Sequence, residues 1–377
     1  MILNQLQLTN HRNYAELSAD FSPSVNIICG RNAQGKTNLL EAVCLLAFGR
    51  SYRNAREREM IKMGCDFSEI RANVTSAGRE NVLELRLFQS AKRRLVKNGV
   101  KLATAGEAAG TVTAVMFDPG DLDLVRGGPE GRRRELDAVI SQLRPRYADA
   151  LSEFRRLYTG KLRILRDYAE KPSLLTMLDE YNDGLIHCGA RLVFYRASFM
   201  KKLATFAKIQ HRDCSGGAEE LEITYMTERG VPTDFAENIE PREAIQRIAA
   251  ALAERQSEHR DHEIASQRCL VGAQRDDFEL TINGISARSF ASQGQARTCA
   301  LALKLAERDL VADDTGEAPI LLLDDVLSEL DETRREFVLE RISGGQVLIT
   351  TCEPGEIPIA DGGRTLEIDA GRLVACT

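Results

Sequence analysis

One short segment of the sequence has the residue types of a phosphate-binding loop. Gly30 and Gly35 enclose four residues and are followed directly by Lys36 and Thr37, which gives the pattern G-x4-G-K-[ST]. In this pattern the glycines let backbone N–H groups point at phosphate oxygens, the lysine neutralises the β- and γ-phosphates, and the threonine hydroxyl binds Mg²⁺. An apolar stretch at 25–29 precedes it and helical spacing follows it, which favours a site for ATP and Mg²⁺ over a glycine-rich turn. The expected nucleotide contacts are Gly30, Arg31, Asn32, Ala33, Gln34, Gly35, Lys36 and Thr37.

A second candidate segment pairs a buried strand with two carboxylates. Four aliphatic residues at 320–323 lead into Asp324 and Asp325. A parallel sheet binds its ligands at the carboxyl ends of its strands, so Asp324 is expected to hold Mg²⁺ together with Thr37, directly or through water. Asp325 is expected to orient and activate the attacking water. Alone, this segment could be a strand that ends in a turn; beside the loop at 30–37 it predicts a hydrolytic site with Asp325, Asp324 and Lys36 as catalytic residues.

A third segment, Ser292-Gln293-Gly294-Gln295, opens a predicted helix that runs to about Val311. The serine can cap the helix, and the glycine lets a ligand approach the backbone. The same residues could simply cap an ordinary helix. Because the loop at 30–37 already serves one nucleotide, this second helix N-terminus is expected to contact ATP held by another copy of the chain.

The periodicity of apolar residues predicts the elements that must position these groups. Asn-Gly pairs at 98–99 and 283–284 predict hairpins, and Pro145 should kink or divide a long helical stretch. Strands are predicted at 2–8, 25–29, 69–74, 82–88, 112–117, 221–226, 319–324 and 346–351, and helices at 36–48, 132–210, from 241 onward, 294–311 and 331–342.

The α/β pattern therefore occurs at both ends of the chain and is interrupted by a helical block. A single insertion explains this arrangement more economically than three independent domains. The predicted fold class is α/β, a mixed P-loop sheet flanked by helices, with an inserted helical lid. The expected bounds are 1–124 and 271–377 for the split ATPase domain and 125–270 for the mainly helical lid.

Composition points to a soluble protein of the cytoplasm. No apolar run approaches the roughly 20 residues needed to span a bilayer, and the first residues do not resemble a signal peptide. The nine cysteines are scattered without a CxxC pair, which indicates reduced thiols rather than a disulfide framework or a zinc site. We therefore expect no membrane association.

One segment is basic in a chain whose net charge is −6. From Arg126 to Arg166 the sequence has 11 Lys and Arg against 5 Asp and Glu. Such a segment could be a solvated helix face with internal ion pairs. Arginine also suits phosphate, and without interleaved aromatic residues we expect contact with the DNA backbone rather than with bases. The expected DNA contacts are Arg132, Arg133 and Arg134.

The order and spacing of these motifs resemble ABC-type ATPase heads of the SMC group, and most closely the RecF family of bacterial recombination mediators. ABC transporters carry Ser-Gly-Gly-Gln and Asp-Glu where this chain has Ser-Gln-Gly-Gln and paired aspartates. Further matching segments are 8–14, 49–53, 117–122, 132–137, 272–277, 292–298 and 323–331.

This resemblance implies a homodimer that forms on ATP and sandwiches two nucleotides, joining Lys36 and Thr37 of one subunit to Ser292 and Gly294 of the other. Residues 328–331 resemble the D-loop that crosses such an interface. The resemblance also implies slow, DNA-dependent ATP hydrolysis and sequence-independent binding at single-strand gaps and single/double-strand junctions. It implies action with RecO and RecR in loading RecA, in recombinational repair, replication-fork maintenance and the SOS response.

Two departures and three alternatives bear on this interpretation. The segment 272–277 usually reads Gly-Pro-His-Arg-Asp-Asp, but Ala273 and Gln274 replace Pro-His here. Transporters place a switch histidine where this chain has Thr350-Thr351. A transporter subunit would need that histidine, a small-molecule kinase would lack the segment at 292–295, and an SMC head would need a far longer coiled coil than the insertion provides.

Overall fold

The computed structural model describes residues 1–53, 55–104, 106–235, 239–342, 344–352 and 362–376. At its centre is a six-stranded sheet in the order β15-β14-β3-β13-β12-β8, parallel except for β15. The strands β12 and β13 are almost continuously apolar because both faces of the sheet are covered. The strand bounds are β3 Val25–Cys29, β8 Ala114–Phe117, β12 Ile320–Asp324, β13 Val347–Thr351, β14 Arg364–Asp369 and β15 Arg372–Cys376.

Different elements cover the two faces of this sheet. Helix α1 (Lys36–Phe48) and a second, antiparallel sheet pack on the face that carries Ile28, Leu322 and Leu348. Helices α8 (Gln293–Thr315) and α9 (Glu332–Arg341) pack on the other face. The antiparallel sheet has the order β2-β1-β4-β5-β6-β7. Its strands are β1 Ile2–His11, β2 Tyr14–Asp20, β4 Phe67–Ser76, β5 Arg79–Phe88, β6 Arg94–Lys97 and β7 Val100–Lys101.

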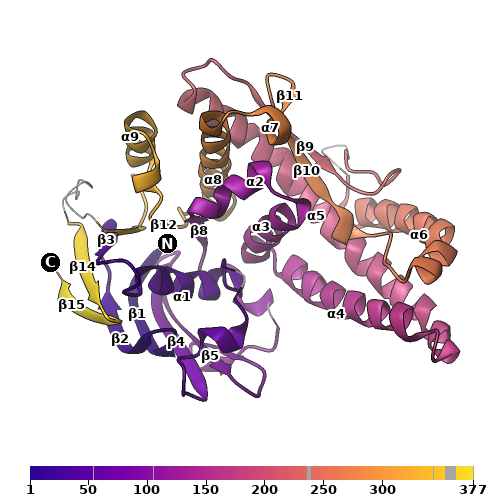
Figure 1. Cartoon of the computed structure of the whole chain (residues 1–377), viewed down its shortest axis with the longest axis horizontal. Helices are drawn as coiled ribbons and strands as arrows, with labels where there is room; N and C mark the ends of the chain where they lie inside the picture. Colours follow the sequence, from indigo (N-terminus) through magenta and orange to yellow (C-terminus); the bar gives the residue numbers. More distant parts are fainter. Residues whose placement is uncertain (54, 105, 236–238, 343, 353–361, 377) are drawn as a thin grey trace.

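The inserted segment is mainly helical, and α4, α5 and α6 extend away from the sheets (Figure 1). Pro145 divides the helical stretch as predicted, because it occupies the first turn of α4, where its missing N–H costs nothing. The helices are α2 Leu122–Arg126, α3 Pro129–Leu143, α4 Pro145–Asp167, α5 Leu178–Cys214, α6 Pro241–Ser266 and α7 Ala287–Phe290. Short 3-10 helices lie at Glu57–Met60, Gly106–Ala108, Pro119–Asp121, Pro172–Met177, Ala273–Arg275 and Leu327–Glu329.

The expected insertion and the expected ATPase domain both contribute strands to one three-stranded sheet. Strand β9 (Leu221–Met226) of the insertion pairs with β10 (Asp277–Ile282), which in turn pairs with β11 (Ile285–Ser286). Helix α8 also contributes side chains to the hydrophobic cluster of the insertion. The two expected units are therefore closely joined, and their division at 124/125 and 270/271 stays a proposal.

A buried charge network fastens the insertion to the segment 272–277. Arg196 of α5 donates to Asp276 at 2.6 Å and to Asp137 of α3 at 2.8 Å, and all three side chains are buried. The hydroxyls of Tyr225 and Thr227 donate to Asp276 as well, at 2.7 and 2.6 Å. A buried charge is tolerated only when it is paired and hydrogen-bonded, so this segment has a structural role that needs neither Pro nor His at 273 and 274.

No helix among the described residues is long and apolar enough to cross a membrane.

Candidate nucleotide-binding site

The loop at 30–35 connects β3 to α1, as the sequence predicts. Gly30 and Gly35 have φ angles of 144° and 120°, in the region that favours glycine. A Cβ on Gly30 would lie 2.2 Å from the carbonyl oxygen of Ile368. The backbone path that exposes the loop's N–H groups therefore depends on glycine, and the start of α1 directs its positive end at the same place.

Asn13 of the β1–β2 turn and Tyr14, the first residue of β2, hold the loop through hydrogen bonds to its carbonyl groups. The side-chain amide of Asn13 donates to the carbonyl of Gln34 at 2.7 Å, and the hydroxyl of Tyr14 donates to the carbonyl of Gly35 at 2.8 Å. Tyr14 is fully buried, and burial raises its pKa, so the hydroxyl stays a donor. Neither residue was predicted to have this role; the only signal was the resemblance of the segment 8–14.

The amine of Lys36 forms hydrogen bonds with carbonyl groups of the loop at 30–35. It donates to the carbonyls of Gly30 at 2.6 Å and Arg31 at 3.1 Å, and it lies 3.3 Å from the sulfur of Cys352. Lys36 is buried, so the positive charge is held where the phosphates of a nucleotide would meet the backbone N–H groups. This placement suits the predicted role of the lysine.

Asp324 is where the two halves of the predicted site meet. It ends β12, and its Oδ1 accepts a hydrogen bond from the hydroxyl of Thr37 at 3.0 Å and another from Thr350 at 2.7 Å. Its Oδ2 accepts from the hydroxyl of Tyr52 at 2.8 Å. Hydroxyl and carboxylate oxygens are the ligands that Mg²⁺ prefers, so Thr37 and Asp324 fit the ion that the sequence predicted for them. Tyr52 was not predicted.

Asp325 adopts an unusual backbone conformation directly beside the magnesium carboxylate. Its φ is 56°, which is uncommon for a residue other than glycine and is found at functional sites. Its N–H donates to the hydroxyl of Thr350 at 3.0 Å, and the hydroxyl of Ser328 lies 2.7 Å from its backbone carbonyl oxygen and 3.2 Å from its carboxylate. Thr350, which stands where transporters have a switch histidine, therefore forms hydrogen bonds with both Asp324 and Asp325.

The segment 292–295 forms a reciprocal cap at the start of α8. The hydroxyl of Ser292 accepts from the N–H of Gln295 at 3.1 Å, and the side chain of Gln295 accepts from the N–H of Ser292 at 2.8 Å. The predicted capping role of Ser292 is confirmed. Within the described ranges no hydrogen bond or ion pair joins residues 292–295 to residues 30–37, so the two segments make no direct polar contact within one chain.

The three consecutive arginines of α3 have different surroundings. Arg132 is 3% exposed, and its guanidinium donates to both carboxylate oxygens of Asp277, at 2.6 and 2.8 Å. Arg133 donates to the carbonyl of Asp276 at 2.7 Å, and Arg134 pairs with Glu130 at 3.2 Å. Because its guanidinium is buried in a bidentate pair, Arg132 cannot reach a DNA backbone in this conformation, and that part of the prediction is wrong.

Comparison with known proteins first defines a class. Residues 2–363 match the family described as "RecF/RecN/SMC N terminal domain". A solved SMC head bound to the C-terminal winged-helix domain of ScpA is 15% identical and superposes with a TM-score of 0.54 over 100% of this chain and 98% of that one, which shows the shared fold. The fold is therefore that of an SMC-like, ABC-type ATPase head.

Relatives of higher identity narrow the class. The "DNA replication and repair protein RecF" of Heliobacterium modesticaldum is 39% identical over 99% of both chains, and that of Clostridium acetobutylicum is 37% identical over 99% of both. The solved structure of "the recombination mediator protein RecF-ATPrS in RecFOR pathway" superposes with a TM-score of 0.87 at 31% identity, covering 99% of this chain and 98% of that one. The chain belongs to the RecF family, as the sequence predicted.

Proposed function

We propose that the protein is an ATP-dependent DNA-binding clamp of recombinational repair and replication-fork maintenance. The observation that carries the proposal is the hydrogen bond between Thr37 and Asp324, which are 287 positions apart, together with the separate helix end at 292–295. The phosphate-binding loop and the magnesium carboxylate meet within one chain. In the described part of the chain, the helix start at 292–295 makes no polar contact with that loop. A second copy, bound through ATP, would bring the two halves together.

Each group has a defined task in this clamp. The loop N–H groups and Lys36 bind the β- and γ-phosphates, while Thr37 and Asp324 hold Mg²⁺, which neutralises charge on the phosphates when bound. Asp325 accepts a proton from the attacking water and orients it. Ser292, Gln293, Gly294 and Gln295 of the second copy bind the same nucleotide from the opposite side. Hydrolysis is weak and stimulated by DNA, and it opens the clamp.

The proposed DNA surface is the exposed face of α4, with Arg133 and Arg134 beside it. This helix has six Lys and Arg against three Asp and Glu. The side chains of Arg156 and Arg166 are 65% and 68% exposed, and their ion pairs with Glu153 and Asp167 are surface pairs of little strength. Phosphates can therefore compete for these arginines. Further exposed arginines on α4 are Arg146, Arg155 and Arg163.

The names of the relatives support the cellular role. Curated relatives are called DNA replication and repair proteins, and the solved structures come from the RecFOR pathway. We propose that this chain acts in the cytoplasm with RecO and RecR at single-strand gaps and single/double-strand junctions, without sequence preference, and helps to load RecA as part of the SOS response.

Light scattering tests the clamp directly. The protein is measured alone, with ATP and Mg²⁺, and with gapped DNA added. We expect twice the monomer mass only when ATP and Mg²⁺ are both present, and a larger DNA-bound mass with gapped DNA. A protein that stays monomeric at saturating magnesium nucleotide, with and without DNA, would overturn the proposal.

A further inference from the structure

The segment that follows α1 returns to the nucleotide site at a single contact. Helix α1 ends at Phe48, and four residues later the hydroxyl of Tyr52 donates to Oδ2 of Asp324 at 2.8 Å. The segment is tied down on the way, because the hydroxyl of Ser51 donates to the buried carboxylate of Glu41 and accepts from the N–H of Arg53 at 3.1 Å. The position of the Tyr52 ring is thus fixed by α1 and by Asp324 together.

This contact controls the rotation of the Asp324 carboxylate. Thr37 and Thr350 both donate to Oδ1, and among the described residues Oδ2 accepts only from Tyr52. A Thr37 hydroxyl that held Mg²⁺ through an oxygen lone pair would keep its proton and could still donate to Oδ1 of Asp324. The hydroxyls of Tyr52 and Thr350, one on each carboxylate oxygen, would fix how Asp324 turns toward the ion.

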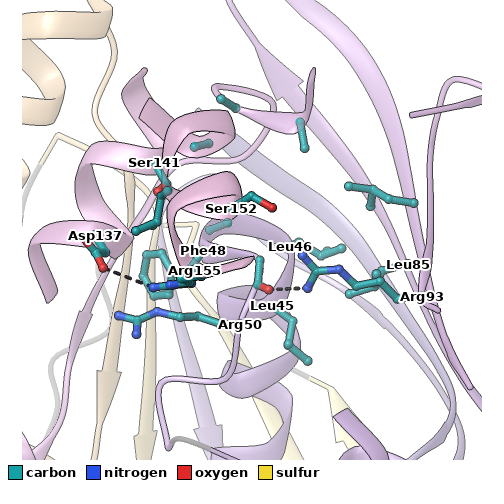
Figure 2. A pocket seen from close by; sticks show the side chains of 17 residues that line it. Leu45, Leu46, Phe48, Arg50, Leu85, Arg93, Asp137, Ser141, Ser152 and Arg155 are labelled. Carbon is teal, nitrogen blue, oxygen red and sulfur yellow. Dashed lines mark hydrogen bonds and ion pairs between the residues drawn. The ribbon is translucent and has the colours of Figure 1, made fainter. Parts of the chain in front are cut away.

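The other side of the same segment contacts the insertion. The guanidinium of Arg50 donates to the carbonyl of Arg134 in α3. Figure 2 shows the Arg50 side chain beside that of Arg155, which is paired with Asp137 at 3.1 Å. A cavity of about 240 Å³ lies beside this segment. Its lining includes Arg50 and Tyr52, Arg134 and Glu135 of α3, and Lys304 of α8.

We propose that residues 50–52 couple the insertion to the magnesium site, with Tyr52 as the positioning residue for Asp324 and Arg50 as the contact with α3. A shift of α3 moves Arg50, which is two residues from Tyr52, and the cavity leaves room for that movement. DNA bound to the insertion thereby alters how Asp324 meets Mg²⁺. This inference rests on the proposed function, because it takes the insertion as the DNA-binding part and the site as an ATPase.

The contact between Tyr52 and Asp324 is tested with Tyr52→Phe, which removes only the hydroxyl. The Mg²⁺ concentration that half-saturates ATP hydrolysis is measured, and binding of a fluorescent ATP analogue is measured in EDTA. We expect the half-saturating Mg²⁺ concentration to rise about tenfold or more, as the loss of one hydrogen bond to a charged group predicts, while binding in EDTA stays as in the wild type. Tyr158→Phe, which removes a hydroxyl from α4, is the matched control.

A residue that only stabilises the fold would lower the turnover and the melting temperature without changing the response to Mg²⁺. A Tyr52→Phe variant with the wild-type Mg²⁺ dependence would therefore overturn the positioning role. If the wild type hydrolyses no ATP, the proposed function fails instead. The Mg²⁺ dependence of analogue binding then tests Tyr52 in the same way.

The contact between Arg50 and α3 is tested with Arg50→Met, which keeps the apolar stem of the side chain. The half-saturating Mg²⁺ concentration is measured with and without gapped DNA, and a thermal melt establishes that the variant is folded. We expect DNA to shift this concentration severalfold in the wild type and to leave it unchanged in Arg50→Met. A wild type that shows no shift, or a folded variant that shows the full shift, would overturn the coupling.

Discussion

Arg334 joins the start of α9 to the start of α8. Its guanidinium donates to the carbonyl of Gly294 at 3.1 Å and to the hydroxyl of Thr298 at 2.9 Å. Asp331, which caps α9 with its side chain, holds the same guanidinium in an ion pair. The segment 292–295 and the D-loop-like segment 328–331 are therefore one connected surface, and both are proposed to face the nucleotide of a second copy.

Arg334→Ala should separate these two segments without touching the phosphate-binding loop. Each hydrogen bond of a charged group contributes about 1.5–3 kcal/mol, so we expect ATP-driven dimerisation to weaken about tenfold or more. Binding of a fluorescent ATP analogue to the monomer should be unchanged. Sedimentation at several protein concentrations measures the first quantity. Arg372→Ala, an exposed change in β15, is the control, and equal dimer affinity in both variants would contradict the link.

Lys36→Met tests whether nucleotide binding and clamp formation are one event. The change removes the charge that lies over the carbonyls of Gly30 and Arg31, while the methionine can fill the same space. We expect ATP-dependent dimers and retention on gapped DNA to disappear together, as light scattering and gel-shift titrations would show. Dimers that still form on ATP would separate the loop from the clamp.

Asp325→Asn should leave ATP binding intact and prolong the life of the dimer. The amide keeps the size of the carboxylate and can still contact Ser328, but it cannot accept a proton from water. Dimer dissociation after dilution into ATP-free buffer gives the measurement, with Asp324→Asn as a comparison that should weaken Mg²⁺ dependence instead. If Asp325→Asn dimers dissociated as fast as the wild type, the water-activating residue would have to be sought elsewhere.

Neutralising the exposed arginines of α4 should flatten the salt dependence of DNA binding. Each phosphate contact that is lost reduces the slope of log K against log salt by about one, so Arg156→Gln with Arg166→Gln should lower it by up to about two. Arg132→Gln should leave the slope unchanged, because its guanidinium is paired with Asp277 in the interior. An unchanged slope in the double variant would place the DNA surface away from α4.

Motifs made of neighbouring residues correctly predicted the loops, turns and helix starts that they form. The loop at 30–37, the Asn-Gly hairpins and the start of α4 at Pro145 depend on residues close together in the chain, and all are present. The strands β2, β14 and β15 were missed. Strand β2 has few large apolar residues at its buried positions, and strand β15 has no buried residue, so both carry little apolar signal.

Contacts between residues far apart in the chain could not be predicted from the sequence. Arg132 pairs with Asp277 and Tyr52 with Asp324, at separations of 145 and 272 positions. A run of three arginines looks the same whether one of them is buried or all are in water. The resemblance to the RecF family drew attention to the segments 49–53 and 132–137, but not to what their side chains contact.

His11 should make the fold sensitive to mild acid. It is fully buried at the end of β1, with its Nδ1 3.1 Å from the hydroxyl of Ser68 and its Nε2 without a partner among the described residues. Burial, and to a lesser degree the charge of Arg12, lowers its pKa from 6.5 to about 4, although Glu41 acts in the opposite direction. Between pH 6.5 and pH 4 the unfolded chain therefore binds a proton at this residue that the folded chain does not.

The sign of the effect follows from that difference. The folded state is fully stabilised above pH 6.5 and loses stability as the pH falls, by about 3 kcal/mol in all for a shift of this size. In urea unfolding at pH 7 and pH 5, the wild type should lose about 2 kcal/mol more than His11→Gln, whose amide does not titrate. Carboxyl groups that titrate in the same range are common to both proteins and cancel in the comparison. An equal loss in the two proteins would mean that His11 binds a proton as readily in the folded state as in the unfolded chain.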